Sequence, residues 1–256
     1  MFTTGVDGLL RKTLESLYNE GKYTGDILIL KYDYFRPSFM NWLKKHNAII
    51  KEVSKHYKYM SMDRYYHYNK ILKEIGENYD VLMHLDGNDI RIYEDINPLL
   101  KQAENKICVV PEDNGVSRSI NREWDGWFNY LSKEDLDSEW WKLLKDKVMI
   151  NGGMYAGPAK LVMNLLDYMV KEIDRVQTWG IDQAILNRYV YTVKPQDFKF
   201  MDISWDYVAW MGHFQHTIDG CIATIGDKRF KIKILHLVNI MFIRNKPWDK
   251  EIKSWS

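Results

Sequence analysis

The chain has 256 residues, of which 46% are hydrophobic and 28% are charged, enough to bury the core of one α/β domain. Its 36 Lys and Arg residues nearly balance its 35 Asp and Glu residues, so no excess of positive charge is available to attract a nucleic-acid backbone. The two cysteines form no CxxC pair and no apolar run reaches the roughly 20 residues that cross a bilayer, so we expect no disulfide scaffold, structural zinc site or membrane span.

Hydrophobic periodicity predicts alternating helices and strands in the first half of the chain. The helices are expected at 5–21, 36–46 and 62–75, and the strands at 25–30, 47–53 and 79–85. Such alternation favours a doubly wound, mostly parallel sheet. Only residues 1–4 precede the first helix, so the first strand is either very short or shortened by trimming of the N-terminus.

The second half continues the pattern around one long insertion. A strand is expected at 106–110, a tryptophan-rich and acidic insertion at 116–147, helices at 158–171 and 181–189, and a last core strand at 230–238. We find no internal repeat or clear linker, so a single domain over residues 1–256 is expected. The N-terminus carries no signal-peptide pattern, and we expect a soluble, cytoplasmic protein.

The strand predicted at 79–85 runs directly into the polar turn Asp86-Gly87-Asn88-Asp89. Ligands of doubly wound sheets gather at the carboxyl ends of strands, where this turn would lie. Clustered oxygen ligands suit a hard divalent cation that bridges two phosphates, and Gly87 lets the turn approach a ligand closely. The alternative is an ordinary strand-to-helix turn, in which Asp, Asn and Gly are favoured for conformational reasons alone.

Four short segments, taken in order, resemble the motifs of GT-A glycosyltransferases, in particular the glycogenin-like enzymes of glycosyltransferase family 8. The four are the strand and turn from Tyr79 to Asp89, Asn151-Gly152-Gly153 followed by Gly157-Pro158, Asp182-Gln183 followed by Asn187, and His236 followed by Lys246-Pro247-Trp248. The resemblance implies a single Rossmann-like GT-A domain, with a mixed, mostly parallel sheet flanked by helices. It implies a hexosyl- or pentosyltransferase that uses a UDP-linked nucleotide-sugar donor, Mn²⁺ or Mg²⁺, and a glycan or glycoprotein acceptor.

The resemblance also implies roles for individual residues. Asp86 would contact the donor ribose and the metal, Asn88 or Asp89 would be a second metal ligand, and His236 would complete the set. Asp182 and Gln183 are the predicted catalytic residues, bonded to sugar hydroxyls near the anomeric carbon. The predicted cofactor-binding residues are Thr3, Thr4, Arg64, Lys70, Asp86, Gly87, Asn151, Gly152, Gly153 and Lys246.

The chain departs from the family pattern at two places. The family separates its two aspartates by one residue, whereas here that position is Asn88 and the next acid is Asp89. The gap from His236 to Lys246 is also longer than in the family, and Asn239 stands in place of its usual glycine. Both the second metal ligand and the role of Lys246 therefore remain open in the sequence.

Several alternatives stay open at this stage. Asp182 could be a helix N-cap, and Asn151-Gly152 a strand-ending turn that needs positive φ. The family retains anomeric configuration, whereas an inverting enzyme would need a base such as Asp182 or Asp206. His213 and His216 are reserve metal ligands, the remaining histidines lack a carboxylate at metal-ligand spacing, and Trp124 and Trp127 are candidate acceptor contacts. The rival functions are a sugar nucleotidyltransferase and a non-catalytic carbohydrate-binding protein of the same fold.

Overall fold

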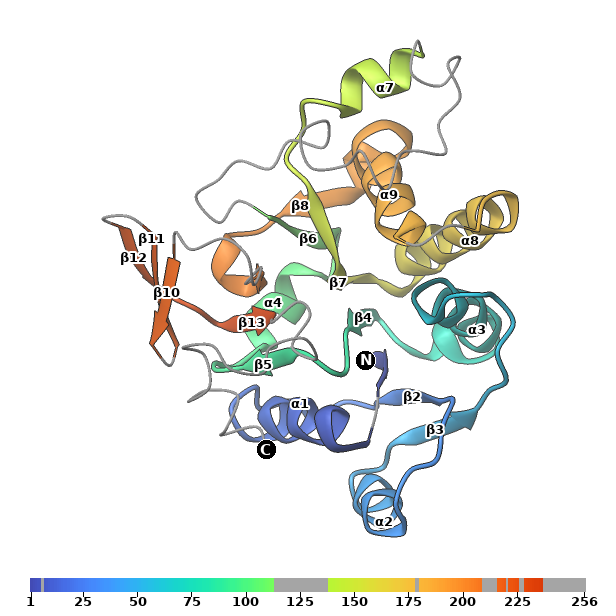
Figure 1. The fold of residues 1–256 in the computed structure, drawn as a ribbon, viewed down its shortest axis with the longest axis vertical. Coiled ribbons are helices and arrows are strands. Elements are labelled where there is room, and N and C mark those ends of the chain that lie inside the picture. The colour runs from blue at the N-terminus through green and yellow to red at the C-terminus, as the bar shows by residue number, and fades with distance from the viewer. Residues whose placement is uncertain are drawn as a thin grey trace.

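A computed structural model describes residues 1–5, 7–112, 138–177, 180–208, 216–219, 221–225 and 228–236. Within these residues a seven-stranded sheet crosses the molecule and carries helices on both faces (Figure 1). In spatial order its strands are β3 (Ile49–Glu52), β2 (Leu28–Lys31), β1 (Phe2–Thr4), β4 (Val81–Leu85), β7 (Ile150–Pro158), β6 (Ile107–Pro111) and β8 (Phe198–Phe200). β7 runs antiparallel to β4 and β6, and the other neighbours are parallel. The predicted mixed, mostly parallel sheet is therefore confirmed.

The helices form two layers because the strands are apolar on both faces, as strands of buried parallel sheets usually are. Leu28 and Leu30 of β2 pack on one side and Ile29 on the other. The first layer contains α3 (Met60–Ile75), α7 (Glu139–Leu144), α8 (Ala159–Arg175) and α9 (Ile181–Arg188), and the second contains α1 (Asp7–Asn19), α2 (Pro37–Lys45) and α4 (Asn97–Gln102). The single-turn elements are η1 (Gly76–Asn78), η2 (Tyr189–Val193), η3 (Pro195–Asp197) and η4 (Ile203–Trp205). No helix in the described part of the chain is long and apolar enough to cross a membrane.

The elements of the first half agree with the predicted ranges to within three residues at each end. The first strand, β1, is indeed short, and it lies between β2 and β4 in the middle of the sheet. This position brings the end of β1 beside the end of β4, where the polar turn begins.

The segment Asn151-Gly152-Gly153 is not a strand-ending turn, so this alternative is wrong. All three residues belong to the nine-residue strand β7, which pairs Leu85 with Met154 and Pro111 with Ile150. Among the described glycines, positive φ occurs at Gly180 and not at Gly152 or Gly153. Gly153 and Gly157 of β7 are explained instead by lack of space, since a Cβ atom at either position would overlap a neighbouring side chain.

The expected core strand at 230–238 is also wrong, because two short strands of two different sheets occupy it. β12 (Lys228–Lys231) pairs with β11 (Ile222–Ile225), which pairs with β10 (His216–Asp219), and β13 (Ile234–His236) lies between β5 (Ile90–Ile92) and β9 (Tyr207–Val208). Between them, the backbone N–H of Ile232 bonds to Cys221 and that of Lys233 to Ser204. An apolar run cannot reveal which sheet it joins, since every strand has the same period.

Candidate active site

The turn after β4 lies at the carboxyl end of the strand, as predicted. The backbone N–H of Asp86 donates to the carbonyl oxygen of Gly153 at 2.8 Å, which ties the turn to β7. A Cβ atom at Gly87 would overlap the carbonyl oxygen of Thr4 and lie 2.9 Å from Thr3 Oγ1, so only glycine lets the turn lie against the end of β1. Thr3 and Thr4 are both buried there, and Thr4 Oγ1 donates to the Leu30 carbonyl oxygen at 3.0 Å.

Asp86, Asp89 and His236 form the cluster best suited to hold a metal ion in the described part of the chain. One ligand atom from each of the three lies within 4.8 Å of the others. His236 Nε2 lies 3.5 Å from Asp89 Oδ1 and 3.8 Å from Asp86 Oδ2. The register of the small sheet explains this, because β13 pairs His236 with Ile90, the residue that follows Asp89. The Asn88 side chain lies against Gly5, where an added Cβ atom would overlap Asn88 Oδ1.

Gly153 makes room for this cluster. A Cβ atom at this position would overlap Cε1 of His236 and lie 2.9 Å from both Asp86 Oδ2 and Asn151 Oδ1. At Gly152 an added Cβ would meet only ordinary contacts, the nearest being Tyr65 at 3.8 Å. The absence of a side chain at Gly153, rather than any unusual backbone conformation, lets an imidazole and a carboxylate meet over β7.

In this buried cluster, charged neighbours together affect the pKa values more than burial does. Burial alone would lower the pKa of His236, but the carboxylates of Asp89 and Asp206 outweigh it and raise this pKa well above its usual value. Burial would raise the pKa of Asp86, but Arg64, His84 and His236 outweigh it and hold this pKa well below its usual value. Asp89 Oδ1 is buried without a hydrogen-bond partner. An unpaired buried carboxylate oxygen is costly, so the arrangement fits a cation ligand.

Arg64 links this cluster to the second pair of predicted residues. Its guanidinium, on α3, bonds to Asp86 through Nη1 and lies 3.5 Å from Asp182 Oδ2 through Nη2. Both Arg64 and Asp182 are buried. Lys70 lies six residues further along α3 and is exposed, so the structure brings Arg64 but not Lys70 to the cluster.

Asp182 is not an N-cap, and this alternative is wrong. Gly180 caps α9 in a left-handed conformation, with φ 78°, and Asp182 is the second residue of the helix. Its carboxyl group is buried and faces Arg64, and the backbone N–H groups of Asp182 and Gln183 also favour its charged form. Burial raises the pKa of Asp182 to about 6, and the attraction of Arg64 only partly offsets this.

The raised pKa of Asp182 predicts a pH-dependent stability. A carboxyl group that binds its proton more tightly in the folded state contributes stability that is present below its unfolded pKa and is lost as pH rises through its folded pKa. The rise from 3.8 to about 6 corresponds to about 3 kcal/mol. We expect the stability of the wild type relative to Asp182→Asn to fall by up to this amount between pH 4 and pH 7, measured by urea unfolding.

Asp202→Asn is the matched control for this measurement. The hydrogen bond from Ser204 lowers the pKa of Asp202, so the sign is reversed: its stabilising contribution is lost only as pH falls below about 4, and the difference between wild type and this variant should change little between pH 4 and pH 7. A difference between wild type and Asp182→Asn that does not change with pH would contradict the prediction.

Glu112 is a buried site residue that the sequence analysis missed. Its Oε1 accepts hydrogen bonds from Asn151 Nδ2 at 2.7 Å and from Gln183 Nε2 at 3.1 Å. A carboxylate only accepts, so it orients both amide groups with their NH₂ toward it. Asn151 Oδ1 then accepts from the Gly153 N–H at 2.7 Å. Glu112 directly follows β6, and the rule that ligands gather at the carboxyl ends of strands could have identified it.

Two histidines expected to lack a carboxylate partner have one in the structure. His84 Nε2 lies 3.4 Å from Asp86 Oδ1, and His67 Nε2 lies 3.4 Å from Asp63 Oδ2. Burial among aromatic rings lowers the pKa of His84 to about 4, so it is neutral near pH 7. Metal-ligand spacing alone did not indicate these pairs, in which the aspartate is two residues from His84 and four residues from His67.

Some predicted residues cannot be placed. Lys246, His213, Trp124 and Trp127 lie outside the described residues, and His216 is described only as part of the backbone of β10. The predicted roles of these residues stay predictions.

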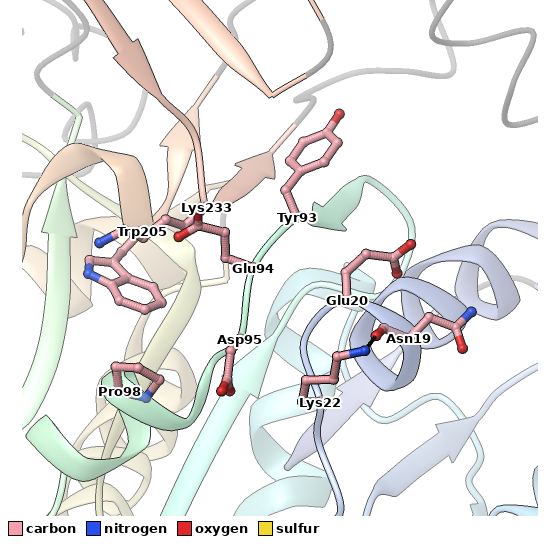
Figure 2. Close-up of a pocket in the computed structure, with 9 residues that line it drawn as sticks. All are labelled: Asn19, Glu20, Lys22, Tyr93, Glu94, Asp95, Pro98, Trp205 and Lys233. Atoms are coloured by element: carbon pink, nitrogen blue, oxygen red, sulfur yellow. Dashed lines mark hydrogen bonds between the residues drawn. The ribbon is translucent and has the colours of Figure 1, made fainter.

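A pocket of about 780 Å³ lies at the other end of the β5–β13 pair, away from His236 (Figure 2). It is lined by Asn19, Glu20, Lys22, Tyr93, Glu94, Asp95, Pro98, Trp205 and Lys233. Lys233 Nζ lies 4.2 Å from the centre of the Trp205 ring, and Lys231 pairs with Glu94 nearby. None of the residues that line the pocket belongs to the Asp86 cluster.

Comparison with known proteins shows which solved structures have a similar fold. No protein-family model and no curated protein sequence matches the chain. Among solved structures, mouse xyloside xylosyltransferase 1 without ligand is similar with a TM-score of 0.58 and 13% identity, over 94% of this chain and 98% of that chain. The galactosyltransferase LgtC, solved with donor and acceptor sugar analogues, gives 0.55 and 12%, over 100% of this chain and 91% of that one. The bifunctional glycosyltransferase WbbM gives 0.60 and 14%, over 100% of this chain and 51% of that one.

These similarities establish the fold, which is that of GT-A-type glycosyltransferases. Identities of 12 to 14% carry no more than the fold, since one fold hosts many chemistries. The argument for function therefore rests on the residues that the fold brings together.

Proposed function

We propose that this protein is a metal-dependent glycosyltransferase of the glycogenin-like family. It would transfer a sugar from a UDP-linked donor to a hydroxyl group of a glycan or glycoprotein. The observation that carries the proposal is the convergence of Asp86, Asp89 and His236 at the carboxyl end of β4, on a GT-A fold. Two carboxylates and one imidazole form a ligand set suited to Mn²⁺ or Mg²⁺.

The cation would be held by Asp86, Asp89 and His236, with Asp89 rather than Asn88 as the second acidic ligand. The support is that Asp89 faces His236, whereas Asn88 packs against Gly5. A divalent cation bound there would neutralise the nucleoside diphosphate as it leaves. Gly87, Thr3 and Thr4 would form the wall beside the nucleotide, and Lys246 would add positive charge to the diphosphate.

The sugar would lie between this cluster and the start of α9. Arg64 contacts both Asp86 and Asp182, so it would hold the two groups in register on either side of the donor. Glu112 accepts one N–H from each of the NH₂ groups of Asn151 and Gln183, and this orientation would leave the amide oxygen of Gln183 as an acceptor for a sugar hydroxyl. Gly152 would let the sugar or the acceptor approach the backbone of β7.

We propose retention of anomeric configuration by a front-face route. The acceptor oxygen would form a bond to the anomeric carbon while the bond from that carbon to the phosphate oxygen breaks. The acceptor proton would pass to the leaving diphosphate. The Asp206 side chain is completely buried and lies 3.5 Å from His236 Nδ1, and this burial disfavours it as the base of an inverting reaction.

The test is donor hydrolysis with UDP-, GDP- and TDP-sugars, with and without Mn²⁺, on the wild type and Asp89→Asn. We expect hydrolysis of one donor only when metal is present, and a fall of about 100-fold or more in Asp89→Asn, because a proposed metal ligand would lose its charge. Asp167→Asn, which breaks a surface pair with Lys73, is the control and should retain full activity.

Other outcomes separate the rival functions. If UDP binds with metal but no sugar is released or transferred, a carbohydrate-binding protein is supported. If UTP and a sugar 1-phosphate give a nucleotide sugar with release of pyrophosphate, the protein is a nucleotidyltransferase. Equal metal binding by the wild type and Asp89→Asn would refute the proposed cation site.

A further inference from the structure

His236 is held between carboxylates on both of its ring nitrogens. Nε2 faces Asp89 and Asp86, at 3.5 and 3.8 Å, on the side of the proposed cation site. Nδ1 faces the opposite way and lies 3.5 Å from Asp206 Oδ1. The two nitrogens therefore have different surroundings, and these can fix which of them carries a proton.

The side chain of Asp206 makes no hydrogen bond that would explain its buried position among the described residues. Its side chain is completely buried, and neither carboxylate oxygen has a hydrogen-bond partner among the described residues. His236 Nδ1 likewise has no hydrogen-bond partner there. Because an unpaired buried carboxylate is unfavourable, the natural counterpart of Asp206 is the one N–H group that it faces.

The backbone holds Asp206 in this place. Asp206 lies between η4 and β9, and β9 pairs in parallel with β13 so that Val208 is opposite His236 and Tyr207 opposite Leu235. The same small sheet joins β13 to β5, which begins just after Asp89. One sheet therefore sets the positions of both carboxylates relative to the imidazole. A shift of about 0.5 Å brings Nδ1 and Oδ1 to ordinary hydrogen-bond distance.

We propose that Asp206 is a positioning residue that accepts a hydrogen bond from His236 Nδ1–H, and so directs the lone pair of Nε2 toward the space between Asp86 and Asp89. The inference rests on the proposed function, since it concerns the ring nitrogen of His236 that faces away from the proposed cation. Metal-bound histidines commonly donate their second N–H to a carboxylate, which fixes the tautomer and the ring orientation. Here the sheet formed by β5, β13 and β9 supplies that carboxylate.

The experiment measures Mn²⁺ binding from the free-ion signal in electron paramagnetic resonance, on the wild type and Asp206→Asn. We expect the Mn²⁺ dissociation constant of Asp206→Asn to rise about 10- to 100-fold, because the amide NH₂ can face Nδ1 and favour the wrong tautomer. At a pH above the raised pKa of His236, where the ring is neutral, the melting temperature without metal should be unchanged or higher, since the variant removes a buried charge. A merely structural role would lower the melting temperature and leave the affinity unchanged.

Asp202→Asn is the matched control on the same loop. Asp202 accepts a hydrogen bond from the Ser204 backbone N–H and does not contact His236, so this variant should lose some stability and keep the wild-type Mn²⁺ affinity. If wild type and Asp206→Asn bind Mn²⁺ equally well while Asp89→Asn does not, the positioning role is wrong and the proposed function stands.

A second measurement tests the proposal even when Asp206→Asn does not fold or the wild type binds no Mn²⁺. ¹⁵N-histidine spectra of the metal-free wild type are taken at increasing pH until His236, whose pKa is raised, becomes neutral, with its signal identified from His236→Gln. The neutral ring should carry its proton on Nδ1, and a neutral ring with its proton on Nε2 would overturn the role of Asp206. Absence of Mn²⁺ binding in the wild type, with the proton on Nδ1, would instead refute the cation site while supporting the hydrogen bond.

Discussion

Gly153→Ala is expected to weaken Mn²⁺ binding by about 100-fold, the upper range for changes that disturb metal ligands without removing them. The new methyl group would overlap the His236 ring and lie 2.9 Å from Asp86 Oδ2, so the two ligands could not keep their positions. His236 is buried on all sides, and a ring in a close-packed interior has little room to shift. The dissociation constant is to be measured with Mn²⁺ alone and with Mn²⁺ and UDP.

Gly152→Ala is the control for this prediction. It makes the same chemical change one residue away, in the same strand, where an added Cβ would meet nothing nearer than 3.8 Å. Its Mn²⁺ affinity should stay within about twofold of the wild type. Equal affinities in the two variants would show that Gly153 does not make space for the cluster.

Arg64→Met is expected to lower the stability of the metal-free protein by about 3 kcal/mol near pH 7, the cost typical of removing one partner from a buried ion pair. The substitution keeps a long apolar side chain but leaves Asp86 and Asp182 without the cation that they share. Stability is to be measured by urea unfolding in EDTA. In saturating Mn²⁺ the loss should be smaller, because the ion would supply positive charge to Asp86.

Lys73→Met is the control on the same helix. Lys73 pairs with Asp167 at the surface, where both side chains are about half exposed, so its removal should cost less than about 1 kcal/mol. A loss in Arg64→Met no greater than that in Lys73→Met would mean that Arg64 does not compensate the two buried carboxylates. A loss that Mn²⁺ does not reduce would argue against Asp86 as a cation ligand.

The sequence predicted most of the fold because the fold depends on local patterns. Apolar runs such as 25–30 and 79–85 have the length and bounds of buried strands, and the intervening segments have helical periodicity. Alternation of the two is enough to indicate a mostly parallel sheet. The same reasoning failed at 230–238, where β12 and β13 have the pattern of one strand but belong to two sheets.

The sequence also predicted part of the candidate site. Asp86 follows an apolar strand, and its place at the carboxyl end of a strand followed from the general rule for doubly wound sheets. His236 and the Asp182-Gln183 pair came from the resemblance to the glycogenin-like family. Glu112 and Asp206, which hold or face these residues, belong to none of the four motifs, and so the resemblance could not assign them these roles.

What the sequence determined by itself is the class of the sheet and the position of the acidic turn, since both are written in residue spacing along one segment. Only the tertiary structure decided which residue of that turn faces His236, because the directions of Asn88 and Asp89 depend on the pairing of β5 with a strand more than 140 residues away. It likewise gave the reason for Gly153, which is the space taken by His236 and Asp86. Contacts of this kind join residues remote in the chain, and no local period encodes them.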